Sequence, residues 1–258
     1  MRKRLIVGSL FSGIGGLDLG LEQAGMKTIW QVEFDDWARD KLDENFPETT
    51  KFKDVRGVGK HNLAPVDLIC GGFPCQDVST LNHKREGLLG KRSGLWSEYY
   101  RIICELRPRY IVIENVTALI SDGLDRLLCD LAEIGYDAEW QTLRASSVGL
   151  PTRRNRLFVV AYAESIRPVP LEVYASTVAG VYEQRERIRS HTTLRYESLE
   201  HTFPTIPEHL RVDIGLSFEF SEIEAAVKGY GNAVCPPVAK WIGERIIEFD
   251  RSRRGYNK

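Results

Sequence analysis

With 258 residues, 43% of them hydrophobic, the chain is long enough to bury one core and to carry a small additional lobe. Its 35 Lys and Arg residues are balanced by 36 Asp and Glu residues, which excludes the strong overall positive charge of many nucleic-acid binders, so any basic surface must be local. The five cysteines form no Cys-x-x-Cys pair, and their odd number argues against a complete disulfide framework. We therefore expect a cytoplasmic protein, and in the absence of a long apolar run we expect no membrane-spanning helix.

Residues 1–163 alternate short, β-prone apolar runs with longer amphipathic stretches, a rhythm typical of βαβ units. Strands are predicted at Leu5–Leu10, Thr28–Val32, Val66–Cys70, Tyr110–Ile113, Ala138–Leu143 and Arg156–Ala161. Apolar residues at three- and four-residue spacing predict helices at Gly16–Ala24, Trp37–Phe46, Trp96–Leu106 and Gly123–Ile134. We therefore expect an α/β domain with a doubly wound, mostly parallel sheet.

After residue 163 the pattern changes twice. Residues 164–225 contain prolines, charges and histidines among isolated apolar residues, which predicts a small irregular lobe. Residues 226–258 contain a turn that reads GYGNAVCPP from Gly229, followed by an amphipathic run from Val238 to Phe249. This run predicts a closing helix that returns to the first domain.

A glycine-rich turn follows the first predicted strand, where residues 10–18 read LFSGIGGLD. Such a turn at the carboxyl edge of a parallel sheet lets a ligand approach the backbone, although the same glycines also fit a tight structural turn. Glu33 ends the second strand, where a carboxylate either accepts hydrogen bonds from both hydroxyls of a ribose or simply lies at the surface. Phe34 could stack on a purine, and Asp54 could accept from an adenine amino group. Together these residues predict a site for a nucleoside-containing cofactor.

Two further segments deliver reactive side chains to the same edge of the sheet. Residues 71–79 read GGFPCQDVS, and the glycines and proline place Cys75 on a rigid turn where its thiol can attack a substrate. The alternative is an inert cysteine in an apolar core. Residues 111–116 read IVIENV, an apolar strand in which partial burial would raise the pKa of Glu114 and keep it protonated. For Glu114 the alternative is a capping or supporting role.

Basic residues gather in two segments, and they are either ordinary solvated charge or a local nucleic-acid surface. The first segment contains Lys84, Arg85, Lys91 and Arg92, and the second contains Arg144, Arg153, Arg154 and Arg156.

Taken together, these motifs resemble those of the cytosine-5 DNA methyltransferase family, and the resemblance covers nearly the whole chain. The matching motifs occur in the family's order: FSGIGG from Phe11, Glu33, Asp54, PCQ from Pro74, ENV from Glu114, RNR from Arg154 and GNAV from Gly231. The resemblance implies a Rossmann-like methyltransferase with S-adenosylmethionine as cofactor, no metal, and double-stranded DNA as substrate. It further implies a bacterial, archaeal or phage-encoded enzyme that acts as a monomer, with a cognate restriction enzyme as an additional candidate partner.

The resemblance also assigns individual site residues. Those of the catalytic step would be Cys75, Glu114, Arg154 and Arg156. Those that bind the cofactor would be Phe11, Ser12, Gly13, Gly15, Gly16, Leu17, Glu33, Phe34, Asp54, Pro74, Asn232 and Ala233. DNA would be contacted by Gln76, Ser79 and Arg92, within a stretch from Gln76 to Gly94 that resembles a mobile loop closing over the duplex.

The implied chemistry follows from the weak nucleophilicity of cytosine C5. The thiolate of Cys75 would add to C6 while protonated Glu114 stabilises the charge at N3, so that C5 can take the methyl group. Loss of the C5 proton and expulsion of Cys75 would complete the cycle. Arg154 and Arg156 could hold O2 of the base or a flanking phosphate, and they could lower the pKa of the Cys75 thiol. The target base must also be flipped out, because a stacked cytosine cannot be attacked on its ring face.

Two features depart from the family pattern. Thr152 stands where the family usually has Gln before its Arg-x-Arg motif, which puts one polar contact in doubt. The usual long target-recognition region is not recognisable within residues 164–225, so this short lobe is the expected recognition element.

Three other functions are compatible with parts of the pattern. One is methylation of cytosine in transfer RNA, although that branch of the family has Cys-Phe-Thr where this chain has TAL after Val116. A second is a non-catalytic DNA-binding module, which the intact Cys75 and Glu114 argue against, or a methyltransferase subunit that needs a partner for DNA recognition. A third, a nicotinamide dehydrogenase, would leave Cys75, Glu114 and the paired arginines without a role.

Overall fold

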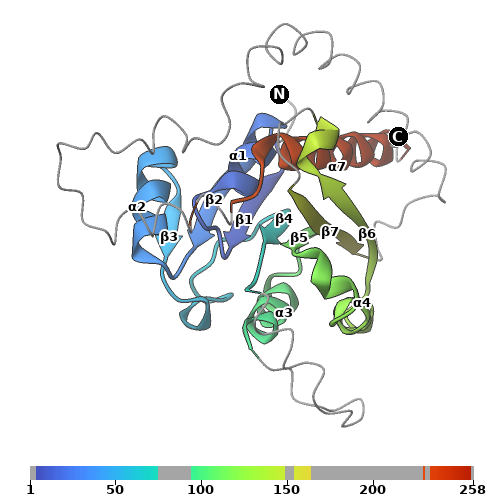
Figure 1. Ribbon diagram of the computed structural model, residues 1–258, viewed down its shortest axis with the longest axis horizontal. Helices are drawn as coiled ribbons and strands as arrows, with labels where there is room; N and C mark the ends of the chain where they lie inside the picture. Colours follow the sequence, from blue (N-terminus) through green and yellow to red (C-terminus); the bar gives the residue numbers. More distant parts are fainter. Residues whose placement is uncertain (1–3, 75–93, 149–153, 164–228, 230–232, 257–258) are drawn as a thin grey trace, which may run out of the picture.

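The computed structural model describes residues 4–74, 94–148, 154–163, 229 and 233–256. Within these residues seven strands form one sheet in the order β3-β2-β1-β4-β5-β7-β6 (Figure 1). All neighbouring strands pair in parallel except β7, which runs antiparallel to both β5 and β6. The strands are β1 (Ile6–Leu10), β2 (Lys27–Val32), β3 (Thr50–Phe52), β4 (Leu68–Gly71), β5 (Tyr110–Asn115), β6 (Tyr136–Arg144) and β7 (Asn155–Ala163).

Helices cover both faces of this sheet, so the expected doubly wound, mostly parallel α/β fold is confirmed (Figure 1). On one face lie α1 (Gly16–Gln23) and α7 (Pro236–Tyr256), and on the other lie α3 (Leu95–Leu106) and α4 (Leu124–Glu133). Beside β3, at one end of the sheet, lies α2 (Asp36–Asn45). Three short 3-10 helices complete the described elements: η1 (Val55–Gly57), η3 (Thr117–Ile120) and η4 (Ala145–Val148).

The central strands are buried on both faces, which explains their unbroken apolar sequences. On β4, Ile69 belongs to the apolar cluster under α3 and α4, whereas Leu68 and Cys70 belong to the cluster under α1 and α7. The same alternation occurs on β5, where Ile111 faces α3 and Val112 faces α7. Two apolar layers therefore fix the sheet, and each fully buried Leu or Ile contributes roughly 1.5–3 kcal/mol relative to an exposed one.

The C-terminal helix α7 packs closely on α1 because glycines leave room for its backbone. A Cβ atom at Gly16 would lie only 2.3 Å from the carbonyl oxygen of Val234, and one at Gly20 would lie 2.3 Å from that of Pro236. The helix begins at Pro236, a position where an N–H would have no acceptor within the helix, so a proline there loses no helical hydrogen bond. It extends in both directions beyond the predicted run from Val238 to Phe249.

Several expectations were incomplete or lie outside the described residues. Strand β3 was not predicted, because three residues are too few to show an alternating pattern. The lobe at residues 164–225 is outside the described part of the chain. None of the described helices has both the length and the apolar content that crossing a membrane requires.

Candidate active site

A cleft of about 790 Å³ opens at the carboxyl ends of β1, β2, β3, β4 and β5. The strand order reverses between β1 and β4, and in open α/β sheets the crevice at such a switch point is where ligands bind. The residues predicted from the sequence that line this cleft are Phe11, Ser12, Gly13, Gly16, Leu17, Glu33, Phe34, Asp54, Pro74, Glu114, Arg156 and Ala233.

The turn between β1 and α1 has the backbone that its glycines permit. Gly13 and Gly15 have φ angles of 55° and 84°, in the left-handed region that favours glycine. Gly15 caps α1, and a Cβ atom there would lie 2.4 Å from the ring of Phe46. Gly15 is not among the described residues that line the cleft, and it shapes the turn at the start of α1; its role in cofactor binding stays a prediction.

Glu33 joins this turn to the end of β2. Its Oε2 accepts a hydrogen bond from the main-chain N–H of Gly13 at 2.7 Å, and its Oε1 accepts one from Asp35 N–H at 2.9 Å. A carboxylate has about four acceptor positions, so two remain for ligand hydroxyls. Beside it, Phe34 is 63% exposed at the rim of the cleft, as a residue that stacks on a ligand must be before binding.

Asp54 follows β3 and makes a paired contact with Arg56. The side chain of Asp54 caps η1 by accepting from Arg56 N–H at 3.0 Å, and it accepts from the Arg56 guanidinium at 2.7 to 3.1 Å. The hydrogen bonds from Arg56 hold the pKa of Asp54 below its ordinary value. Arg56 and Lys53 also line the cleft, and the sequence pattern had not indicated either of them.

A buried polar group lies beneath the glycine turn. Asp18, fully buried on α1, accepts hydrogen bonds from Ser9 Oγ and Gln31 Nε2, both at 3.0 Å. Burial raises the pKa of Asp18 to about 6. Ser12 Oγ donates in turn to Ser9 Oγ at 2.9 Å, and both serines line the cleft. This chain of hydrogen bonds therefore links the core to the wall of the cavity.

The opposite end of the cleft contains a buried acid and two arginines from different strands. Glu114 on β5 is only 8% exposed, and its Oε1 lies 2.9 Å from Nε of Arg156 on β7. Burial raises the pKa of Glu114, while the charges of Arg156 and Arg154 act in the opposite direction. Arg154 is half-buried next to this pair and lines a small adjoining hollow instead of the main cleft. The structure thus brings together three of the four residues predicted for catalysis.

Asn115 holds the segment that leads to Cys75, the fourth residue predicted for catalysis. Its Nδ2 donates to the carbonyl oxygen of Phe73 at 3.0 Å, and its Oδ1 accepts from Val116 N–H at 2.8 Å. Pro74 follows Phe73 and is exposed at the cleft. The next residue, Cys75, lies outside the described residues, as do Gln76, Ser79, Arg92 and Asn232.

The described cysteines provide no alternative nucleophile at the main cleft. Cys70 is fully buried, and burial raises its pKa well above the ordinary thiol value. Cys104 and Cys129 lie on α3 and α4, and neither lines the cleft. Cys235 is half-buried beside Arg154 in the adjoining hollow, and burial raises its pKa too. Within the described residues, no cluster of His, Cys, Asp and Glu side chains could hold a metal ion.

Comparison with known proteins gives a consistent result. A family model described as C-5 cytosine-specific DNA methylase matches residues 5–211. The type II methyltransferase M2.BsuMI of Bacillus subtilis is 39% identical over 161 residues, which cover 59% of this chain and 41% of that relative. The type II methyltransferase M.AquIA of a Picosynechococcus species is 33% identical over 181 residues, covering 62% of this chain and 72% of the relative. The chain spans about half the length of the first curated relatives that it matches.

Solved structures share the fold. A protein described as a DNA modification methyltransferase encoded within an E. coli prophage is 30% identical, with a TM-score of 0.54, over 65% of this chain and 49% of that one. The DNMT2 protein of Spodoptera frugiperda superimposes with the same TM-score of 0.54, over 65% of this chain and 52% of that one. Its sequence identity of 24% supports a common fold only.

Proposed function

The chain belongs to the C-5 cytosine-specific DNA methylase family, and from this premise we propose that it transfers a methyl group from S-adenosylmethionine to C5 of cytosine in duplex DNA. The observation that carries this proposal is the buried Glu114, held against Arg156 in the same cleft as the glycine turn and Glu33. One cavity thus contains both an acid that can donate a proton to a nucleobase nitrogen and acceptors that can bind the hydroxyl groups of a nucleoside.

Glu114 is the group that we assign to N3 of the cytosine. Because burial raises its pKa, the carboxyl group can keep its proton and donate it to N3 as negative charge develops there. Arg156 Nε, at 2.9 Å, holds the carboxyl in place, and Nη1 donates to the carbonyl oxygen of Asn155 at 3.2 Å, so Nη2 is the nitrogen that we assign to O2 of the base or a phosphate. We assign Arg154 the same kind of supporting role from the adjoining hollow.

We propose that Cys75 is the nucleophile, presented by the turn that Asn115 fixes through Phe73. The thiolate forms a bond to C6, and the electron pair of the C5–C6 double bond moves towards the ring nitrogen that Glu114 protonates. After C5 has gained the methyl group, it loses its proton to solvent. The C5–C6 double bond then re-forms as the thiolate leaves, and N3 returns its proton to Glu114.

The residues present fit S-adenosylmethionine, which would supply the methyl group as a sulfonium. Glu33 has acceptor positions left for ribose hydroxyls, Phe34 offers an exposed ring for stacking, and Asp54 stands at the far wall for the adenine amino group. Gly13 lines the cleft with open space where a Cβ atom would stand, which lets a ligand come close to the backbone. We retain Pro74, Asn232 and Ala233 as cofactor contacts, and Gln76, Ser79 and Arg92 as contacts to DNA around a flipped-out base.

The experiment uses duplex DNA that carries 5-fluorocytosine, because fluorine cannot leave C5 as the proton does. The full chain with S-adenosylmethionine should form a stable covalent adduct, and peptide mapping should place the adduct on Cys75. Cys75→Ala should form neither adduct nor methylated product. An adduct on Cys235, or methylation of transfer RNA but not of duplex DNA, would contradict the assignment.

We also propose that the protein acts in the cytoplasm as a monomer beside a cognate restriction enzyme, since its curated relatives are named type II methyltransferases. One alternative, kept open by the short lobe at residues 164–225, is a subunit that needs a partner for DNA recognition. Methylation of a random-sequence duplex library by the purified chain alone distinguishes the two.

A further inference from the structure

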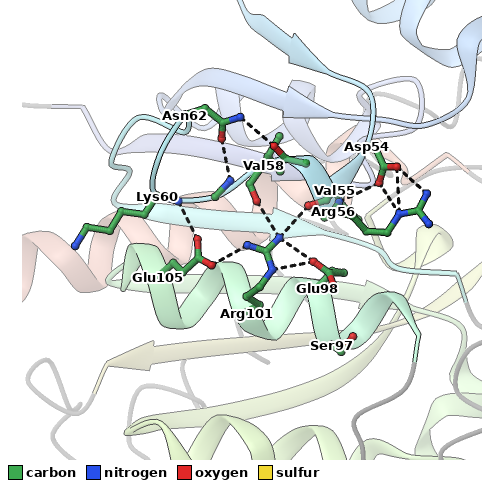
Figure 2. A network of polar contacts seen from close by, with 12 residues as sticks. Asp54, Val55, Arg56, Val58, Lys60, Asn62, Ser97, Glu98, Arg101 and Glu105 are labelled. Carbon is green, nitrogen blue, oxygen red and sulfur yellow. Dashed lines mark hydrogen bonds and ion pairs between the residues drawn. The ribbon is translucent and has the colours of Figure 1, made fainter.

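Arg101 on α3 joins that helix to the turn after Asp54, and Figure 2 shows its guanidinium group between the two segments. Its Nη2 donates to the carbonyl oxygen of Val55 at 3.1 Å and to that of Val58 at 2.8 Å. These carbonyls bracket η1, so one side chain holds both ends of the turn. Hydrogen bonds from a charged donor are about twice as strong as neutral ones, which suits this position.

Two glutamates on the same helix hold the guanidinium in place. Glu98 accepts from Nε and Glu105 accepts from Nη1, each at 2.8 Å and each at helical spacing from Arg101. Glu105 also accepts from the main-chain N–H of Lys60 at 2.8 Å (Figure 2). The fit is close, since a Cβ atom at Gly59 would lie 2.3 Å from Glu105 Oε2. Helix and turn are thus connected by three separate hydrogen bonds.

The turn held in this way forms one wall of the cleft. Asp54, Val55 and Arg56 all line the cavity, and the side chain of Val55 is anchored in the apolar cluster under α3. Arg101 itself is not among the described residues that line the cavity. Any influence of Arg101 on a ligand therefore passes through the position of the turn.

We propose that Arg101 is a positioning residue for the cofactor, which sets the position of the turn at residues 55–59 and thereby presents Asp54 to the adenine end of the ligand. This inference rests on the proposed function, because it presupposes that a nucleoside occupies the wall formed by Asp54. Without Arg101 the carbonyls of Val55 and Val58 lose the charged donor that joins them to α3, and the turn samples other positions. The apparent affinity then falls by the fraction of time that the turn spends in its binding position.

The test measures binding of S-adenosylhomocysteine to the full chain by titration calorimetry. Arg101→Met keeps the apolar stem and removes every donor, and we expect its Kd to rise roughly tenfold. Arg107→Met is the matched control: Arg107 ends the same helix and donates to the carbonyl of Ile134 at 2.7 Å, away from the cleft. Its Kd should remain that of the parent chain. Arg101→Lys keeps the charge with fewer directed donors and should give an intermediate Kd.

A double-mutant cycle separates positioning from a general loss of stability. If Arg101 acts through the turn, Arg101→Met should weaken binding much less in a chain that already carries Asp54→Ala. Additive effects of the two substitutions would overturn the proposal, as would an unchanged Kd for Arg101→Met. If the parent chain itself does not bind S-adenosylhomocysteine, the proposed function fails first. Should Arg101→Met not fold, the Kd of Arg101→Lys decides, and a value equal to that of the parent rejects the proposal.

Discussion

The two ends of the cleft are organised by different kinds of contact. At the β1–β2 end, Glu33 is held by main-chain N–H groups of Gly13 and Asp35. At the β5–β7 end, Glu114 is held by the guanidinium of Arg156, a side chain from a neighbouring antiparallel strand, and is largely excluded from solvent. Two glutamates that line the same cavity thus have different surroundings, main-chain donors at Glu33 and a buried ion pair at Glu114.

On the proposed function, this difference would separate cofactor binding from the chemical step within a single fold. Main-chain donors fix the geometry of Glu33 and leave acceptor positions for a ligand, which suits recognition of hydroxyl groups. Burial raises the pKa of Glu114, which suits a proton donor. Substitutions at the two glutamates should therefore affect different steps, rate at one end and affinity at the other.

The largest effect is expected for Glu114→Gln, which keeps the shape of the side chain but cannot supply a proton. The rate of a single turnover with bound duplex DNA should fall by about 10²- to 10⁴-fold, the usual range for a lost general acid. The Kd for S-adenosylhomocysteine should stay unchanged, because Glu114 lies at the other end of the cleft. In the parent chain the rate should also fall as rising pH removes the proton of Glu114, whose pKa is raised by burial, and this fall should be absent from the variant.

Glu248→Gln provides the control for Glu114→Gln. Glu248 pairs with Arg245 at 2.9 Å on the exposed side of α7, so the same chemical change is made in an ion pair of the same length outside the cleft. It should leave the rate unaltered. If Glu114→Gln turns over as fast as this control, Glu114 is not the proton donor.

Most of the fold could be predicted from the sequence because the central elements carry strong local patterns. The unbroken apolar runs of β4 and β5 and the three- and four-residue spacing along α3 and α4 appear without knowledge of distant contacts. The short β3 has no such pattern and is recognisable only through its pairing with β2. The direction of β7 likewise depends on its neighbours, since an apolar run does not show which way it runs in the sheet.

The candidate site was predictable to the extent that it follows strand ends. Glu33 and Glu114 each stand at or directly after a predicted strand, so the rule that ligands bind at the carboxyl edge already placed them together. Asp54 follows β3, a strand that was not predicted, so this rule did not place it. Arg56, Asp18 and Arg101 were not predicted, because their roles come from contacts between segments far apart in the chain or from the geometry of one turn. A single sequence carries no local signal for such contacts.

The next largest effect is expected on the stability of the fold at the β1–β2 end of the cleft, where Asp18 is buried with Ser9 and Gln31. Burial raises the pKa of Asp18 from 3.8 to about 6, so the folded chain holds its proton more tightly than the unfolded chain. The free energy of unfolding should therefore fall as the pH rises from about 4 to 6, and the total loss from this group should be about 3 kcal/mol. Below pH 4 both states are protonated and the penalty disappears.

Asp18→Asn tests this because an amide does not titrate in that range. Gln31 Oε1 is buried without a hydrogen-bond partner among the described residues, so a flip of the Gln31 amide would let the new side chain keep both of its hydrogen bonds. Urea denaturation should give similar stabilities at pH 4 and a variant that is more stable at pH 7.5 by about 3 kcal/mol. If the difference in free energy of unfolding between parent and variant does not change with pH, burial does not raise the pKa of Asp18.

The smallest effect is expected for Glu33→Ala, which should raise the Kd for S-adenosylhomocysteine roughly tenfold, since hydrogen bonds to a charged acceptor contribute about 1.5–3 kcal/mol. With saturating cofactor the single-turnover rate should match that of the parent, in contrast to Glu114→Gln. Glu22→Ala is a close control. Glu22 accepts a hydrogen bond at 3.1 Å from the main-chain N–H of Thr28 on β2, the strand that Glu33 follows, but Glu22 is not among the described residues that line the cleft. Its Kd should not change.

Loss of Glu33 could weaken binding in two ways, by removing an acceptor for the ribose or by releasing the N–H of Gly13 and loosening the glycine turn. A ligand that lacks the ribose 2′-hydroxyl distinguishes them. If Glu33 accepts from that hydroxyl, the deoxy ligand should bind the parent chain more weakly than the complete ligand, and Glu33→Ala should bind both equally. If Glu33 acts only on the turn, the deoxy ligand should be weakened by the same factor in both chains. The β1–β2 end would then bind the ligand through the geometry of its backbone, whereas the β5–β7 end would act through the side chain of a buried acid.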